Sequence, residues 1–177
     1  MKRAGYYIFV ALSHTITLLP MWALHLLSDL LWPFIYHVVK YRRGVVETNL
    51  RNAFPEKSPE ERKRIAKRFY RHLTDLKVET LKAMHMSPEQ IKKRFSVTDT
   101  SLADRFYSEG RDLVALCSHY NNWEWYSSMQ LSSKHRAVTI YKPLKNKDFD
   151  RFLYKIRTRF GVWVTPMKHI VRDLVKC

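Results

Sequence analysis

The sequence predicts an α/β protein in which a mixed β-sheet is flanked by helices and preceded by hydrophobic N-terminal helices. Three observations support this class. Residues Ala4 to Ser28 include no Asp, Glu, Lys or Arg. The apolar run Leu113 to Cys117 stops at a polar turn, as a buried strand does. Helical and strand patterns then alternate to the end of the chain, which is typical of helices packed on a sheet.

The uncharged segment is long enough to cross a bilayer, but Pro20 interrupts it and apolar residues resume after Asp29. One spanning helix and two apolar helices broken near Pro20 or Asp29 both fit this pattern. Cations flank both ends, so their bias sets no orientation and suits a hairpin or an in-plane anchor; they are Lys2, Arg3, Lys40, Arg42 and Arg43. We expect residues 1–40 to be an uncleaved membrane anchor and residues 41–177 to be the folded domain.

Capping patterns place the next helices. Ser58-Pro59-Glu60-Glu61 combines a capping box with Pro at the first helical position, so a helix is predicted to begin there. A second, short helix is predicted to begin at Ser87. Residues 95–98 are predicted to form a strand and residues 99–106 a helix, which Gly110 closes before the apolar run.

The predicted strand at 113–117 delivers His119 to its carboxyl end, where active-site groups of α/β sheets gather. Asn122 is expected to cap a helix over residues 123–131, with Glu124 in its first turn. A histidine near neutral pH can take a proton from a hydroxyl, and a carboxylate on its other ring nitrogen fixes the tautomer. Alone, this pair also fits a loop histidine without a catalytic role.

The stretch His119-Tyr120-Asn121-Asn122-Trp123-Glu124 resembles the motif of a histidine, four residues and an acid in lysophospholipid and lipid A acyltransferases. It is closer to the lipid A (lauroyl or myristoyl) branch, which typically has an aromatic residue after the histidine and an Asn-Trp-Glu ending. The resemblance implies a glycerolipid acyltransferase-like αβα fold without a cofactor. His119 would be the general base, Glu124 its support, and Asn122 and Trp123 substrate-binding residues.

The implied reaction is transfer of a fatty acyl chain from acyl carrier protein to a hydroxyl of a lipid A precursor. It would take place at the cytoplasmic face of the bacterial inner membrane. Members of this family usually continue beyond the length of this chain, so we expect it to be a C-terminally truncated portion of the family's domain.

A second block supports the resemblance. Residues 137–141 are predicted to form a strand, and the following Lys142-Pro143-Leu144-Lys145-Asn146 resembles the family's second motif, where Arg is usual at the position of Lys142. The resemblance implies that Lys142 and Asn146 bind the substrate, although Lys offers a phosphate a point charge and not a planar fork.

The remaining elements follow that block. A helix is predicted over residues 148–160, where Arg151, Lys155 and Arg159 form a cationic row that fits a phosphorylated sugar or an acidic protein helix. Plain solvation of the helix explains the same row. A strand over 162–165 and a final helix over 169–176 complete the prediction.

The composition limits the classes of partner that the protein can bind. Lys and Arg number 32 against 16 Asp and Glu, for a net charge of +16, which implies an acidic partner such as nucleic acid, anionic lipid or an acidic carrier protein. The histidines show no metal-ligand spacing, so no metal is expected. The two cysteines do not form a disulfide framework.

Alternatives to acyl transfer onto a lipid A precursor stay open. The chain could acylate another membrane lipid, or it could be a non-catalytic, membrane-tethered basic module. Nucleic-acid binding ranks lower because the Gly-rich and aromatic signatures of common RNA-binding modules are missing. Cys117 as a thioesterase nucleophile is discounted, because a cysteine in an apolar strand is usually buried and inert.

Overall fold

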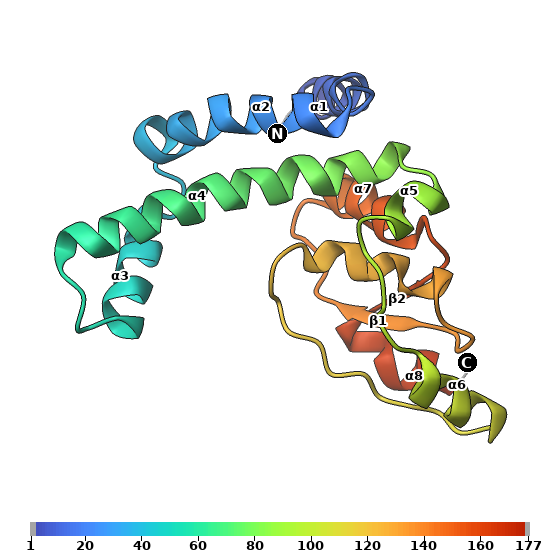
Figure 1. The fold of residues 1–177 in the computed structure, drawn as a ribbon. Helices are drawn as coiled ribbons and strands as arrows, with labels where there is room; N and C mark the ends of the chain where they lie inside the picture. The colour runs from blue at the N-terminus through green and yellow to red at the C-terminus, as the bar shows by residue number, and fades with distance from the viewer. Residues whose placement is uncertain (1–2, 176–177) are drawn as a thin grey trace. The chain divides into compact units, whose positions relative to one another are not determined.

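The structure, a computed structural model, describes residues 3–175 (Figure 1). Lys2 of the predicted anchor flank, Lys176 of the predicted final helix and Cys177 lie outside these residues. The chain divides into two compact units. Unit 2 covers Ile16–Glu79, and unit 1 contains the described residues before and after it. Each unit is described by itself.

The uncharged N-terminal segment forms two helices, α1 (Arg3–Ile16) and α2 (Met21–Phe34). The alternative of two helices broken near Pro20 is therefore the correct one, since Pro20 precedes α2 in an extended conformation, with φ of −64° and ψ of 155°. Within residues 3–175, no helix combines the length and the apolar character needed to cross a membrane. The division into an anchor over 1–40 and a domain over 41–177 stays a prediction.

Unit 2 is helical. After α2 come the π-helix η1 (Ile35–Val39), α3 (Arg43–Ala53) and α4 (Pro59–Lys82), of which the last residues belong to unit 1. The predicted capping box begins α4, where the Ser58 N–H donates to Glu61 Oε2 at 2.9 Å and the Glu61 N–H donates to Ser58 Oγ at 3.2 Å. The core is a cluster of Tyr36, Ala66 and Tyr70. Because the Tyr70 hydroxyl donates to the Tyr41 carbonyl at 2.6 Å, this buried phenol is satisfied.

Unit 1 contains the sheet. Strands β1 (Val138–Tyr141) and β2 (Trp163–Pro166) pair in parallel, with Val138 opposite Trp163, and α7 (Lys147–Thr158) connects them. In the view of Figure 1, α7 and α8 (Ile170–Leu174) lie on opposite sides of the strands. Apolar residues of α7, of β2 and of the segment between them are buried, and they include Phe152, Ile156, Val162 and Val164. This part confirms the prediction of a sheet with flanking helices, although the described residues form a small parallel sheet and not a mixed one.

Short elements complete unit 1: η2 (Ala83–His85), α5 (Pro88–Lys92), α6 (Ser101–Ser108) and η4 (Met167–His169). Ser87 caps α5 in the predicted capping box with Gln90. The strand predicted over 95–98 is wrong. The Phe95 N–H bonds to the Ile91 carbonyl at 2.8 Å, so this residue closes α5 and no ladder begins there.

The strand predicted over 113–117 is also wrong. Residues 111–120 have no regular structure and all are exposed, with Val114 90% and Leu116 96% accessible. A strand requires a neighbour to bond its N–H and C=O groups. Within residues 3–175, no strand pairs with this run, so its apolar character alone does not produce a strand.

The helix predicted over 123–131 has the right bounds and the wrong type. It is a 3₁₀-helix, η3 (Trp123–Leu131), and Asn122 precedes it without a side-chain cap. Hydroxyls of Ser127 and Ser128 donate to the carbonyls three residues back, at 2.9 and 2.8 Å. These local bonds compete with α-helical geometry and suit the tighter turn.

A histidine pair joins α1 to η2 within unit 1. His14 Nδ1 lies 3.1 Å from His85 Nε2, and their rings meet edge to face. Burial lowers the pKa of His85, and the charges of His14, Lys82 and Arg159 lower it further. Because all of these neighbours are basic, they oppose protonation of His85.

We predict that His85 makes the protein less stable in mild acid. The pKa of His85 is lower in the folded protein than in the unfolded chain, where it is near 6.5. Well above pH 6.5 both states are neutral at this residue and no stability is lost. As the pH falls through the unfolded pKa, the unfolded chain binds the proton first, so the free energy of unfolding decreases. His85→Gln cannot take this proton, so its loss of thermal midpoint between pH 8 and pH 5.5 should be smaller than that of the parent. The control is His72→Gln, at an exposed position of α4. An identical loss in parent and His85→Gln would contradict the prediction.

Candidate active site

The central motif lines a cavity of about 170 Å³ in unit 1. Four elements contribute: the loop before η3, η3 itself, β1, and the α7–β2 segment. The lining residues are Cys117, Ser118, His119, Trp123, Glu124, Tyr126, Ser127, Thr139, Ile140, Arg157, Val162 and Val164. Both predicted catalytic residues therefore face the same space, together with Trp123 of the predicted substrate-binding set.

His119 lies on the irregular loop and is exposed. Its ring packs on the Trp123 indole with centroids 4.5 Å apart and an interplanar angle of 51°. Asn121, between them, has a positive φ of 52°, so the loop turns sharply here. Asparagine tolerates this left-handed conformation better than most residues. The turn folds His119 back over the start of η3.

Glu124 is engaged by Arg157 and not by His119. The Arg157 Nη2 and Nε groups donate to the two carboxylate oxygens at 2.6 and 2.8 Å. The two side chains are only 18% and 13% exposed, so this is a half-buried, bidentate ion pair. The hydrogen bond to Glu124 raises the pKa of the Arg157 guanidinium, which stays charged. Within residues 3–175, no hydrogen bond joins Glu124 to His119.

Arg157 was not among the residues predicted for the site, although its position in α7 carried a signal. It lies four residues after Leu153 and three before Phe160, so it borders the apolar side chains of this segment. A cation on the apolar edge of an amphipathic helix needs a buried partner or a route to solvent. Glu124 is that partner.

The predicted cations of α7 lie elsewhere. Arg151 is exposed, and Arg159 donates to the Met86 carbonyl at 3.0 Å. Neither lines the cavity. Substrate binding by Arg151 and Arg159 stays a prediction. The hydrogen bond from Arg159 to the Met86 carbonyl gives Arg159 a structural role.

The second motif block forms the loop between β1 and α7. Asn146 caps α7, with its side-chain oxygen accepting from the Asp148 and Phe149 N–H groups at 3.0 and 3.3 Å. Asp150 holds the same loop by accepting from the Leu144 N–H at 2.8 Å. Lys142 is exposed and does not line the cavity. The structure therefore gives Asn146 a capping function, and substrate binding by Asn146 and Lys142 stays a prediction.

Cys117 corrects an expectation. It was expected to be buried in a strand, but it is exposed on the loop and lines the cavity two residues from His119. Because the strand does not form, burial is no argument against its reactivity. Within residues 3–175, no group of three or more His, Cys, Asp or Glu side chains is placed to hold a metal ion.

The arrangement supplies the parts of a general-base site. An exposed imidazole, a half-buried carboxylate and a guanidinium surround one space, and apolar residues of the sheet form part of its wall. A carboxylate can accept more than two hydrogen bonds, so Glu124 can keep both bonds to Arg157 and still receive an imidazole N–H.

We predict that Arg157→Ala destabilises the protein by about 3 kcal/mol, because it leaves the carboxylate half-buried without its partner. Glu124→Ala should cost a similar amount, and the double variant should cost less than the sum by at least about 1 kcal/mol. Urea unfolding of the four proteins measures these values. The control is Arg151→Ala, an exposed cation of the same helix, with an expected change within about 0.5 kcal/mol. Equal costs for Arg157→Ala and Arg151→Ala would contradict the predicted pairing energy.

Comparisons with known proteins agree with the motif. A comparison with curated proteins and one with solved structures found no match. A family model described as bacterial lipid A biosynthesis acyltransferase matches residues 1–177. The match covers both motif blocks and all residues that line the cavity. The chain therefore belongs to the bacterial lipid A biosynthesis acyltransferase family.

Proposed function

We propose that this chain transfers a fatty acyl group from acyl carrier protein to a hydroxyl of a lipid A precursor, with His119 as the general base. The observation that carries the proposal is that His119 and Glu124 line one cavity in a member of this acyltransferase family. The net charge of +16 suits both an acidic carrier protein and a phosphorylated lipid. We place the reaction at the cytoplasmic face of the inner membrane, where a lipid acceptor is available.

The chemistry needs no acyl-enzyme. His119 removes the proton from the acceptor hydroxyl, and the oxygen attacks the thioester carbonyl to form a tetrahedral oxyanion. The oxyanion collapses, the carbon–sulfur bond breaks, and the imidazolium returns the proton to the leaving thiolate. Glu124 orients the imidazole and stabilises its charge. This requires the His119 ring to turn from Trp123 toward Glu124 when substrate binds, since catalytic hydrogen bonds often tighten only in the complex.

Two cations are candidates for stabilising the oxyanion, Lys142 of the second motif block and Arg157, and Arg157 is the better placed. Its two bonds to Glu124 use only part of the donors of a guanidinium, and it lines the cavity, which Lys142 does not. A fixed cation beside developing negative charge in a site partly shielded from water lowers the barrier. Arg157 thus holds the orienting carboxylate and presents positive charge to the reacting carbonyl.

We predict that His119→Ala lowers acyl transfer at least about 100-fold, because the acceptor hydroxyl loses its base. The assay follows transfer of labelled acyl groups from acyl carrier protein and, separately, from coenzyme A to a lipid A precursor or a glycerophospholipid. His72→Ala is the control, since His72 is exposed on α4. Activity with coenzyme A alone would replace the proposed donor, and a glycerophospholipid preference would replace the acceptor. A His119→Ala variant as active as its parent would show that His119 is not the general base.

We predict that no acyl group becomes attached to Cys117 during turnover. The thiol is exposed in the cavity, so a thioesterase-like route through an acyl-cysteine is chemically open to it. Mass spectrometry of protein quenched during turnover should show the unmodified mass of the peptide that contains Cys117, with His119→Ala as the comparison. An acyl adduct that forms in the parent and decays when the acceptor is added would overturn the direct mechanism.

A further inference from the structure

Basic side chains of unit 1 gather where several of its helices end. We call them the basic cluster, which consists of His14, Lys82, His85, Arg94 and Arg159. His14 lies in the last turn of α1, and Lys82 ends α4. His85 ends η2, Arg94 follows α5, and Arg159 closes α7. None of the five lines the cavity of the candidate active site, so the basic cluster is a separate feature of the unit.

Direct contacts bring the side chains of the basic cluster together at η2. His14 Nδ1 lies 3.1 Å from His85 Nε2. Arg159 Nη2 donates to the carbonyl of Met86, the residue after His85, at 3.0 Å. This bond uses one of the five N–H groups of a guanidinium. Lys82 precedes His85 by one turn of η2, and side chains at this spacing in a 3₁₀-helix lie one above the other. The end of η2 is therefore surrounded by basic groups from α1, α4 and α7.

The charges of the basic cluster repel one another. Burial lowers the pKa of His85, and the nearby charges that lower it further are all basic. Burial also lowers the pKa of Lys82, and the charge of Arg94 lowers it further. Among the described residues, no carboxylate forms an ion pair with Arg94 or Arg159. Like charges held together in this way favour a bound anion, because it would relieve their repulsion.

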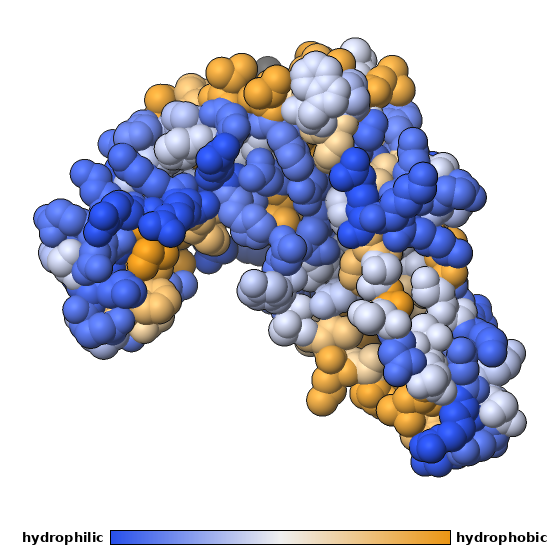
Figure 2. All heavy atoms as spheres, in the orientation of Figure 1, coloured by the Kyte–Doolittle hydropathy of each residue, from blue (hydrophilic) through white to orange (hydrophobic). Residues whose placement is uncertain are grey.

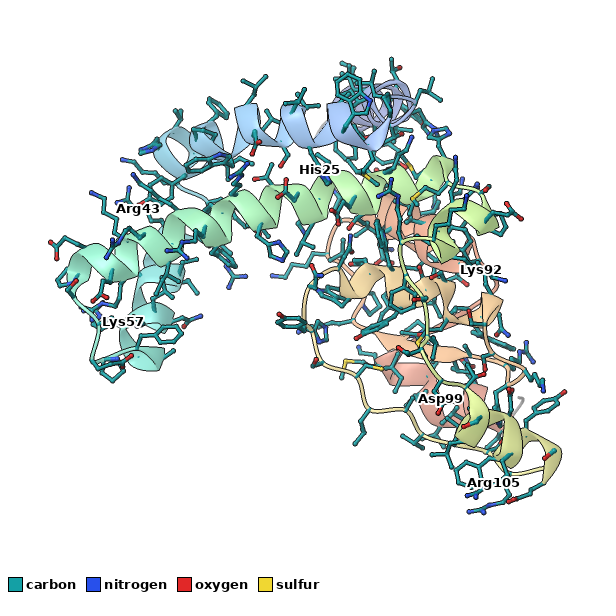
Figure 3. All side chains as sticks on the ribbon, viewed as in Figure 1. His25, Arg43, Lys57, Lys92, Asp99 and Arg105 are labelled. Atoms are coloured by element: carbon teal, nitrogen blue, oxygen red, sulfur yellow. The ribbon has the colours of Figure 1, made fainter. Side chains whose placement is uncertain are left out.

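The helix ends compensate this positive charge only in part. A helix C-terminus carries about half a negative charge, so the ends of α1, α4 and α7 supply roughly 1.5 charges in total. The three cations Lys82, Arg94 and Arg159 exceed that sum before either histidine is protonated. Lys92, labelled on α5 in Figure 3, and Lys93 are exposed and add to the excess. Hydrophilic residues, blue in Figure 2, gather over the position of α5 in Figure 1.

The histidine pair can offer an anion two hydrogen-bond donors. A neutral imidazole has one N–H and one acceptor nitrogen. When both rings are neutral, their contact uses one N–H, and the two outer nitrogens present one donor and one acceptor. One added proton preserves the contact and makes donors of both outer nitrogens, His14 Nε2 and His85 Nδ1. Binding of an anion at these nitrogens is therefore coupled to the uptake of one proton.

A phosphate group matches the donors and the charge of the basic cluster. It carries up to two negative charges and three strong acceptor oxygens, whereas a carboxylate has one charge and two oxygens. A guanidinium can bind two of the oxygens, and an ammonium acts as a point charge. We propose that the basic cluster binds a doubly charged phosphate group, with Arg159 and the two histidines as donors and Lys82 and Arg94 as supporting charges. This inference goes beyond the proposed function and does not depend on the acyl-transfer chemistry.

The first test is calorimetry of the full chain with inorganic phosphate and with sulfate, at constant ionic strength. Sulfate keeps two negative charges between pH 6 and pH 8, so a change in its affinity over this range reports protonation of the protein. We expect sulfate to bind at least about threefold more tightly at pH 6 than at pH 8, because the histidine pair takes up a proton. An affinity for sulfate that is equal at both pH values would overturn the proposal.

Two variants separate the proton from the permanent charge. His85→Gln cannot take up a proton, so its affinity for sulfate should no longer depend on pH. Arg159→Gln should bind sulfate and phosphate at least about tenfold more weakly at both pH values, because a charged donor is lost. The matched controls are His72→Gln and Arg68→Gln at exposed positions of α4, which should bind as the parent does. Equal weakening in Arg159→Gln and Arg68→Gln would show attraction to the overall charge and overturn the proposal.

The second test uses the parent protein and therefore does not depend on a variant that folds. NMR signals of the histidine ring protons give the pH midpoint of protonation of each ring. Saturating sulfate should raise this midpoint for His14 and His85 and leave that of exposed His72 unchanged, since the anion binds the protonated pair. Identical midpoints with and without sulfate would overturn the proposal.

The source of the phosphate group is tested by competition with sulfate at pH 6. Inorganic phosphate and glucosamine 1-phosphate should both displace sulfate from the parent. Tighter binding of the sugar phosphate would support the proposal and assign the site to a phosphorylated sugar, and equal binding would support it and assign the site to free phosphate. Failure of both compounds to displace sulfate would overturn the proposal.

Discussion

The bidentate ion pair between Glu124 and Arg157 determines how the cavity is built. It joins η3 to α7, two elements that lie 33 residues apart in the chain. Because each oxygen of the carboxylate receives its own N–H, the pair fixes the direction of the Glu124 side chain and not merely its charge. The first turn of η3 therefore presents its carboxylate to the same space that β1 and β2 border.

That constraint changes how the histidine–acid motif is understood. A spacing of five residues suggests a local dyad, but Glu124 is held by a residue far along the sequence, while His119 rests on Trp123. The carboxylate of Glu124 is held by two hydrogen bonds, and His119, the proposed base, is on an irregular, exposed loop. A site with one fixed and one movable partner can admit a bulky acceptor before the dyad closes, which is consistent with a lipid substrate.

Local signals predicted the helices well. The capping boxes at Ser58 and Ser87 gave the correct starts of α4 and α5, since these bonds depend only on residues within one turn. The break at Pro20 was predictable for the same reason. The strands at 138–141 and 163–166 were also found from their apolar runs.

The features that the sequence did not predict correctly depend on contacts between residues that are far apart in the chain. The run at 113–117 has a strand's composition, but a strand exists only with a partner, and pattern analysis cannot count partners. Arg157 was overlooked because its significance depends on Glu124 across the fold, whereas the more conspicuous row of Arg151 and Arg159 lies outside the cavity.

The same pairing explains why an Arg is suited to position 157. A lysine would neutralise Glu124 with a point charge and leave the carboxylate free to rotate, whereas the planar guanidinium fixes both oxygens. With those oxygens fixed, the lone pairs that Arg157 does not use have defined directions, so an incoming imidazole N–H meets an acceptor that is already oriented. In the proposed mechanism, the positive charge of Arg157 favours the oxyanion that forms in the same step. Glu124 and Arg157 thus face the two charges that the proposed step creates: the carboxylate faces the imidazolium and the guanidinium faces the oxyanion.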